Sequence, residues 1–272
     1  MSNVSREESV LREKQRKRNE EFLNSLWKLE TKVNDGILEG THDAEGLKKL
    51  LQAFLEEKGI NISLAQAINI LGHSNVITAK QTANAWGIEA PKKAPIRHNE
   101  ATLRQCAQEN QQSNADWRIV YCFGDSLRDL WKRFGTDPKQ QPCFCKDSAW
   151  LLKSEEDSWA TKKMESGYYL INFFGQFSNM TRNQQEAGII ILGNKYERCH
   201  EAIFSEAIFT IFMVNNGERI AKDWYHRGVS TDSVGGCVGV GYFNADGFIV
   251  FDGRDGYCDH DLRVSVARKF DY

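Results

Sequence analysis

The sequence lacks several features that would assign a function class at once. Its 35 basic and 37 acidic residues leave a net charge of −2, far too weak a field for a protein that coats nucleic acids or membrane surfaces. The longest apolar stretch, near Ala207–Val214, falls well short of the roughly 20 residues that span a bilayer. No apolar segment follows the basic N-terminal residues as it would in a secretory signal. We therefore expect a cytoplasmic protein with no membrane span and no nucleic-acid partner.

Cysteine and proline are also sparse. Seven cysteines scattered over 272 residues form no disulfide framework, so reduced thiols are expected. Two of the four prolines, Pro91 and Pro95, flank a pair of lysines and mark a boundary between segments. The composition, 41% hydrophobic and 26% charged, is that of a globular chain with enough length for one or two domains. We expect no cofactor, and the composition leaves the oligomeric state open.

The most informative absence lies near the C-terminus. The 44 residues from Tyr225 to Arg268 contain no Lys, Glu, Gln, Met or Trp, although 64 of the other 228 residues belong to these five types. At that rate about 12 would be expected in a segment of this length. A segment of β-strands and turns disfavours Glu and Lys, but this alternative does not account for the simultaneous loss of Gln, Met and Trp.

The five missing amino acids share a property of their codons, because every one of those codons ends in a purine. Randomising the first two bases of an asparagine codon, AAC, gives fifteen amino acids and never these five. The segment is correspondingly rich in what remains, with 8 Gly, 6 Asp and 4 Arg. This pattern predicts a tail that was written by mutation confined to chosen codons.

Hydrophobic periodicity predicts an α+β protein in three parts. Residues 1–90 read as a helical region, with a charged helix over 7–32 followed by a small bundle. Residues 91–115 read as a linker and connecting helix, and 116–272 as a mixed domain of short strands and helices. Strands are predicted at Trp117–Cys122 and Tyr168–Phe173, and helices at Ser126–Phe134, Thr181–Leu192 and His200–Val214.

Within the last segment, alternation separates fixed positions from free ones. In the stretch from Cys237 to Phe243, Val238 and Val240 share one face of a predicted strand, while Cys237, Gly239 and Gly241 share the other. The same holds for the stretch from Leu262 to Ala267, where Arg263 and Ser265 lie opposite the aliphatic residues. Residues 252–261 have almost no apolar content and are expected to form an exposed loop.

Six stretches resemble a known family. They are APIRHNEATLRQCAQEN from Ala94, DWRIVY from Asp116, TDPKQQPCF from Thr136, SGYYLINF from Ser166, WYHRG from Trp224 and LRVSVARKF from Leu262. Over about residues 94–272 the chain resembles target proteins of diversity-generating retroelements, and in particular a group from candidate-phylum bacteria. The N-terminal helices match nothing of known role.

The resemblance implies a non-enzymatic protein that binds an unknown protein or glycan ligand through a surface rewritten by a nearby reverse transcriptase. It implies a C-type-lectin-like fold, related to formylglycine-generating enzymes, in which the first and last strands meet. We accordingly expect 168–173 to pair with 263–269. The candidate variable, ligand-binding residues are those off the aliphatic frame that an AAC codon could generate: Ser233, Gly236, Cys237, Gly239, Tyr242, Asn244, Phe251, Asp252, Arg254, Asp255, Tyr257, Cys258, Asp259, His260, Arg263 and Ser265. Tyr, Phe, Asp, Arg, His and Ser are the residue types of a paratope.

Other patterns allow different functions. The helices Ser63–Leu71 and Thr78–Trp86 have helix-turn-helix proportions, and Lys80, Gln81 and Asn84 would then read DNA; a single Lys makes an ordinary helix pair the better interpretation. Alternatively, these helices dock a partner and the C-terminal domain is a sensor. Cys237 and Cys258 are the nearest candidates for the cysteine pair of a formylglycine-generating oxidase.

Three further groups invite a chemical interpretation that we do not favour. Cys143 and Cys145 could be half of a zinc site, but no second Cys/His pair has zinc-like spacing. Cys199 and His200 are adjacent and open an apolar helix, which is unusual for a nucleophilic dyad. Four carboxylates, Asp252, Asp255, Asp259 and Asp261, could gather calcium, but their spacing is not that of an EF-hand loop. No catalytic residue and no metal ligand are therefore predicted.

Overall fold

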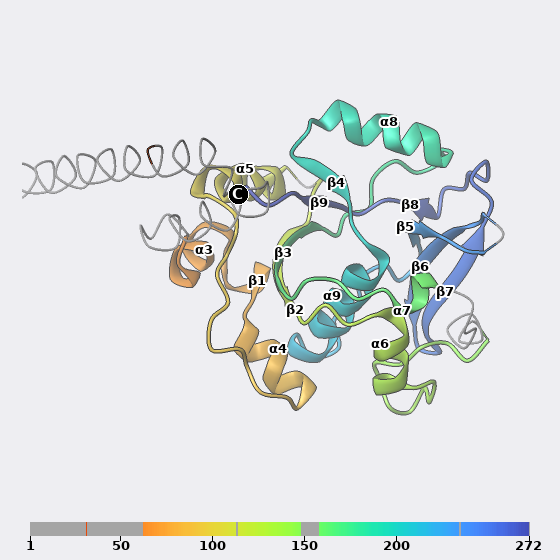
Figure 1. The fold of residues 1–272 in the computed structure, drawn as a ribbon, viewed down its shortest axis with the longest axis horizontal. Coiled ribbons are helices and arrows are strands. Elements are labelled where there is room, and N and C mark those ends of the chain that lie inside the picture. The colour runs from red at the N-terminus through yellow and green to blue at the C-terminus, as the bar shows by residue number, and fades with distance from the viewer. Residues whose placement is uncertain (1–30, 32–61, 113, 148–157, 234, 272) are drawn as a thin grey trace, which may run out of the picture. The chain divides into compact units, whose positions relative to one another are not determined.

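The computed structural model, which describes residues 31, 62–112, 114–147, 158–233 and 235–271, contains two mixed β-sheets (Figure 1). The first sheet has the order β1-β2-β3-β9-β4. Its strands are β1 (Val76–Ile77), β2 (Trp117–Cys122), β3 (Gly167–Asn172), β4 (Tyr196–Arg198) and β9 (Val266–Arg268). β3 pairs antiparallel with β9, Ile171 opposite Ala267, so the expected pairing of 168–173 with 263–269 is confirmed.

The second sheet is built entirely from the segment that lacks the five amino acids. Its order is β7-β6-β5-β8, with β5 (Tyr225–Thr231), β6 (Cys237–Asn244), β7 (Gly247–Gly253) and β8 (Leu262–Arg263). β5, β6 and β7 are successive antiparallel neighbours, whereas β8 runs parallel to β5. The chain then crosses to the first sheet between Arg263 and Val266.

Seven helices surround the sheets in the described ranges: α3 (Leu64–Leu71), α4 (Ala79–Trp86), α5 (Glu100–Gln111), α6 (Leu127–Phe134), α7 (Ser158–Thr161), α8 (Arg182–Leu192) and α9 (Glu201–Val214). Three of them begin with a capping box, in which a Ser or Thr and a Gln three residues later satisfy each other's backbone N–H groups. The capping residues are Ser63, Thr78 and Thr181. This local chemistry explains why the predicted helix starts were accurate.

Helix α9 packs against strands of both sheets, namely β2, β5 and β6. Every residue from Glu201 to Ile211 is buried, including the polar residues Glu201, Ser205, Glu206 and Thr210. Phe209 makes ring contacts with Phe134, Phe144 and Phe248 at 5.0–5.3 Å. A buried aromatic ring of this kind contributes roughly 1.5–3 kcal/mol to stability, so α9 holds the two sheets in a fixed relation.

The α+β class is confirmed, but the predicted domain boundary is not. The compact unit that contains both sheets begins at Ile62, so α3 and α4 belong to it rather than to a separate region of residues 1–90. β1, between these helices, pairs in parallel with β2, and Trp86 donates from Nε1 to Thr210 on α9 at 3.1 Å. The two-residue strand gives no periodic signal, which is why the sequence placed the boundary too late.

Three further expectations concern the linker at residues 91–115, the charged helix over 7–32 and the absence of a membrane span. Within the linker predicted at residues 91–115, Ile96 is buried and forms a bridge with Ile62, whereas Lys92, Lys93 and Pro95 are exposed. The charged helix over 7–32 and the helical stretch that follows it lie outside the described residues, apart from a helical Thr31. Among the helices of the described ranges, none combines the length and apolarity required to cross a bilayer.

The helix pair α3–α4 is not a simple helix-turn-helix. A 3₁₀ turn, His73–Asn75, and strand β1 separate the two helices. Lys80, Gln81 and Asn84 are all exposed, but the Gln81 side chain accepts from the backbone N–H of Thr78 at 2.9 Å. That side chain is therefore engaged in capping its own helix.

Candidate binding surface

The second sheet has a core face and an outer face, as its alternation predicted. Val238, Val240 and Val250 are almost completely buried and belong to the main hydrophobic cluster. On the other face lie glycines 239 and 241, and three aromatic side chains gather beside them. Tyr225 contacts Tyr242 at 4.7 Å and Phe251 at 4.6 Å between ring centroids. All three are half-buried, so they offer an aromatic surface to solvent.

Gly239 and Phe251 are sterically coupled across the β6–β7 pair. A Cβ atom added at Gly239 would lie 1.9 Å from the Phe251 ring, which is far inside van der Waals contact. Any other residue at 239 therefore requires the ring to move or to be replaced. If both positions vary, they must vary together.

We predict that Gly239→Ser lowers the free energy of unfolding by roughly 1–3 kcal/mol, the usual cost of overpacking. Adding Phe251→Ser should remove this penalty, so that the double variant is as stable as Phe251→Ser alone. Urea denaturation of the two single variants and the double variant measures the coupling directly. Strictly additive effects would show that the two positions are independent.

The loop that follows β7, residues 254–261, is held by its main chain. The carbonyls of Asp255, Asp259 and Asp261 accept from the backbone N–H groups of Arg182 (3.1 Å), Asn179 (3.0 Å) and Tyr225 (2.7 Å) respectively. Between them, the carbonyl of Tyr257 accepts from the guanidinium of Arg227. The anchoring points are thus alternate carbonyls, and three of the four donors are backbone groups. No loop side chain takes part in these four bonds.

Arg227 is the one side chain that supplies such an anchor. It is 1% exposed and also donates from Nη1 to the Met180 carbonyl and to Gln185 Oε1, both at 3.2 Å. The neighbouring Arg182 donates to the Val229 carbonyl and lies 3.5 Å from Asp255 Oδ1. The two arginines therefore join the loop to β5 and to the start of α8.

The remaining WYHRG residues are structural. Trp224 lies in the core, and the buried His226 links three segments: its Nε2 lies 2.8 Å from the Cys199 carbonyl, and its Nδ1 accepts from the Ser265 N–H at 3.0 Å. Burial lowers the pKa of His226 to about 3, so it is neutral in this role. Gly228 has no room for a side chain, because an added Cβ would lie 2.3 Å from the Glu201 carboxylate.

Thirteen of the sixteen predicted site residues are exposed or half-buried. The three exceptions are Cys237, Gly239 and Ser265. Cys237 lies beneath Arg182 and Asp255, and Gly239 lies beneath Phe251. Ser265 must be withdrawn from the surface: it is 0% exposed because it sits where the chain passes from one sheet to the other and is covered on both sides. The strict alternation assumed for 262–267 ends there.

The sequence missed other residues at this surface. Tyr225 lies in the segment that lacks the five amino acids, but it belongs to the WYHRG stretch. Val229 lies in the same segment and is not among the predicted site residues. Met180 and Arg182 lie before the segment from Tyr225 to Arg268, so its amino-acid composition could not have indicated them. Their place beside the loop follows only from the way the segment 174–182 packs along it.

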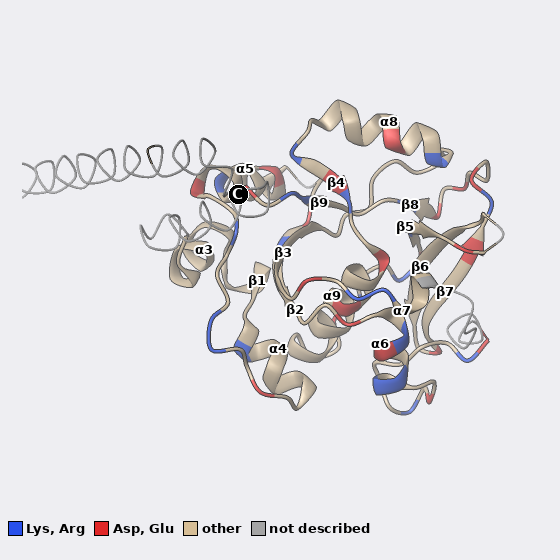
Figure 2. Ribbon diagram, in the orientation of Figure 1, with Lys and Arg blue, Asp and Glu red and all other residues tan. Residues whose placement is uncertain are grey.

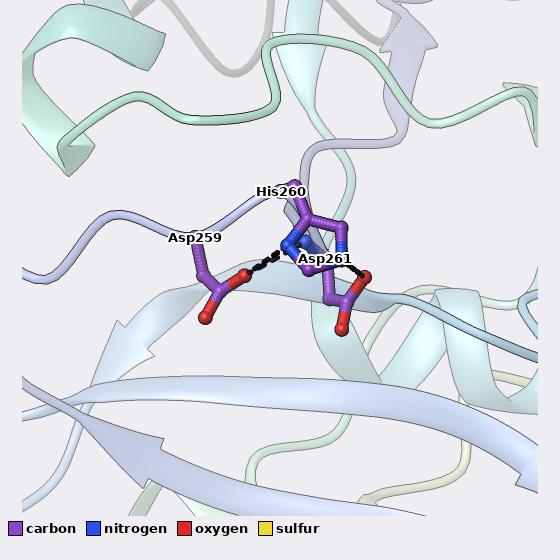
Figure 3. A group of neighbouring side chains, drawn as sticks. All are labelled: Asp259, His260 and Asp261. Carbon is purple, nitrogen blue, oxygen red and sulfur yellow. Dashed lines mark hydrogen bonds and ion pairs between the residues drawn. The ribbon is translucent and has the colours of Figure 1, made fainter.

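The four carboxylates considered as a calcium site fall into two groups. Asp252 and Asp255 line an open hollow together with Asp232. Asp259 and Asp261 instead flank His260, whose Nδ1 and Nε2 lie 2.7 and 2.9 Å from them (Figure 3). The hydrogen bond from the Tyr257 hydroxyl lowers the pKa of Asp259. In the described ranges, only the group of Asp259, His260 and Asp261 has three such ligand atoms within 4.8 Å of one another. Such pairing is common on surfaces without a metal, so it does not define a metal site.

The cysteine and histidine pairs have structural surroundings. His200 caps α9, its Nδ1 accepting from the Ala202 N–H at 3.2 Å, and burial raises the pKa of the Cys199 thiol well above its usual value. Phe144, between Cys143 and Cys145, is buried and bridges to Phe248. Burial also raises the pKa of the Cys237 thiol, whereas Cys258 is exposed; both are free thiols. A raised thiol pKa disfavours the thiolate, which is the reactive form.

Comparison of the chain with protein-family models, with curated proteins and with solved structures found no match.

Proposed function

We propose that this protein is a non-enzymatic binding protein whose ligand-contacting surface is the outer face of the second sheet together with the loop 254–261. The proposed fold type is C-type-lectin-like, and the proposed origin of the surface is diversification by a retroelement. The proposed ligand is a protein or a glycan. One observation carries the proposal: the loop is anchored through four of its carbonyl groups, while side chains such as Arg254, Cys258 and His260 are exposed.

This anchoring matters because a diversified surface must tolerate change without unfolding. A carbonyl group is the same in every residue type, so an anchor on the main chain survives substitution of the side chain it belongs to. Substitutions at exposed positions without special contacts usually alter stability by no more than about 0.5 kcal/mol. Loops that are fixed in this way also lose little conformational entropy on binding.

The position of the segment that lacks Lys, Glu, Gln, Met and Trp supports the same proposal. The segment from Tyr225 to Arg268 begins with the first residue of β5 and ends with the last residue of β9. It therefore supplies the whole second sheet and the loop that connects it to the first. Within it the aliphatic frame is buried, and all but three of the candidate positions reach the surface.

The DNA that flanks the gene tests this proposal. We expect a near-copy of the roughly 130 bases that encode the 44-residue segment, next to a reverse transcriptase gene, with adenines at the codons of the exposed candidates such as Asp252, Arg254 and His260. Sister copies of the gene should differ at those codons and agree at Val238, Val240 and Leu262. Copies that keep the exposed polar residues and vary elsewhere would instead indicate an enzyme with a fixed site, and would refute the proposal.

A further inference from the structure

An apolar ridge borders the loop, formed by the exposed side chains of Met180, Val229 and Tyr257. They are 37%, 40% and 53% exposed. The two arginines bring them together, since Arg227 donates to the carbonyls of Met180 and Tyr257, and Arg182 donates to the carbonyl of Val229. Exposed apolar side chains on segments that are tied together in this way are typical of the centre of a protein–protein contact.

An acidic hollow of about 490 Å³ lies next to these residues, because Asp255 in its lining pairs with Arg182, which donates to the Val229 carbonyl. Its charged lining residues are Asp232, Asp252, Asp255 and Arg254, and three glycines complete it. With Arg182, which pairs with Asp255, three carboxylates face two guanidinium groups, so the hollow keeps an excess of one negative charge. Figure 2 shows the acidic segments at this end of β7 and in the adjacent loops. Asp255 belongs to both features, because it also pairs with Arg182 at 3.5 Å.

We propose, building on the function inferred above, that the ligand is a protein, and that a Lys or Arg side chain of this protein enters the acidic hollow while an apolar patch beside it covers the ridge. Charge complementarity favours a basic side chain over any neutral or acidic group in this place. A neutral glycan would gain little from the excess negative charge, and an acidic glycan would be repelled by it. The ridge gives an apolar partner surface that sugars do not match.

The surface divides into constant and variable parts. Met180 and Arg182 lie outside the segment from Tyr225 to Arg268, whereas Asp252, Arg254 and Asp255 lie within it. Sister copies would therefore keep Met180 and Arg182 while changing the charges of the hollow. Met180 would supply an apolar contact common to all copies, and the hollow would select among partners.

Titration of the full chain with three defined probes, followed by the amide resonances of Gly235, Gly236 and Gly253, tests this inference. Two blocked peptides share the centre Leu-Phe-Leu and differ only in their flanks, which are arginine in one and glutamate in the other; the third probe is maltotriose. We expect the arginine peptide alone to give saturable shifts. Equal shifts with the glutamate peptide, or saturable binding of maltotriose without the arginine peptide, would overturn the inference.

Matched variants separate the two features. Asp252→Asn should weaken binding of the arginine peptide at least five-fold, and Met180→Ala about three-fold. Asp246→Asn, an equally exposed carboxylate outside the hollow, should leave binding unchanged, and equal effects of the two Asp→Asn variants would exclude the hollow as the site. Peptide binding without variation among sister copies would refute the proposed diversification alone. Variation without peptide binding would refute the inference of a basic partner alone.

Discussion

Replacing Arg227 with methionine is expected to lower the free energy of unfolding by about 3 kcal/mol and to release the loop 254–261. Methionine fills much of the same volume but cannot donate, so the carbonyls of Met180 and Tyr257 lose this donor, while Gln185 Oε1 keeps only the hydrogen bond from Arg198. Leaving buried acceptors unpaired costs about 1–3 kcal/mol for each group, and part of this cost is recovered as water reaches the freed loop. Urea denaturation measures the loss, and limited proteolysis should show new cleavage within 254–261.

The matched control is Arg254→Met, which makes the same chemical change in the same segment of the chain. Arg254 is exposed, and we expect its replacement to change stability by less than about 0.5 kcal/mol with no new cleavage. If the two variants lose stability equally, then the loop is not anchored through Arg227. If neither does, the donors on the main chain hold the loop without help.

The composition of the segment does not distinguish the anchoring Arg227 from the exposed Arg254. Both residues lie in the segment that lacks Lys, Glu, Gln, Met and Trp, and both are amino acids that the proposed mutation could generate. The resemblance placed Arg227 in a motif and Arg254 among the free positions. Only the packing explains the difference: Arg227 is on β5 with its side chain directed under the loop, while Arg254 lies at the start of the loop itself.

Local patterns predicted the elements well. Trp117–Cys122 is strand β2 with the predicted bounds, and the helix starts follow capping boxes that can be read from Thr78 or Thr181 and the glutamine three residues later. The alternation of Val238 and Val240 correctly predicted the core face of β6. These features depend on neighbours within a few residues, so a single sequence contains them.

Non-local features were the ones that failed. Ser265 is buried because two sheets meet around it, and β1 exists because β2 lies beside it. The contribution of Met180 and Arg182 to the surface depends on hydrogen bonds to residues 47 to 73 positions further along the chain. Periodicity reports which side of an element is buried and says nothing about what covers it.

The closing ARKF motif forms part of the scaffold. Arg97 lies over the ring of Phe270 at 3.6 Å from its centroid, and His98 lies 5.6 Å from the same ring. Asp271 accepts from the backbone N–H of Asn99 at 2.8 Å at the start of α5. The motif thus fastens the end of the chain to α5, on the first sheet and away from the proposed binding surface.

His98 makes this junction sensitive to acid. Its side chain is 0% exposed, neither ring nitrogen has a hydrogen-bond partner within the described structure, and burial lowers its pKa to about 4 from 6.5. The unfolded chain therefore binds a proton at His98 as the pH falls below 6.5, whereas the folded protein does not until about pH 4. Stability is lost across this window at about 1.4 kcal/mol per pH unit, or about 3 kcal/mol by pH 4.

We predict that His98→Leu removes this acid-dependent loss while leaving stability at pH 7 equal or up to about 1 kcal/mol higher, since two unpaired buried nitrogens are eliminated. Urea denaturation of both proteins at pH 8, 7, 5.5 and 4.5 gives the difference. The curves should run parallel above pH 7, where His98 binds no proton in either state, and diverge below 6.5 with the variant the more stable. Parallel curves down to pH 4.5 would mean that His98 is protonated in the folded protein, with Asp271, 3.9 Å away, as its counter-ion.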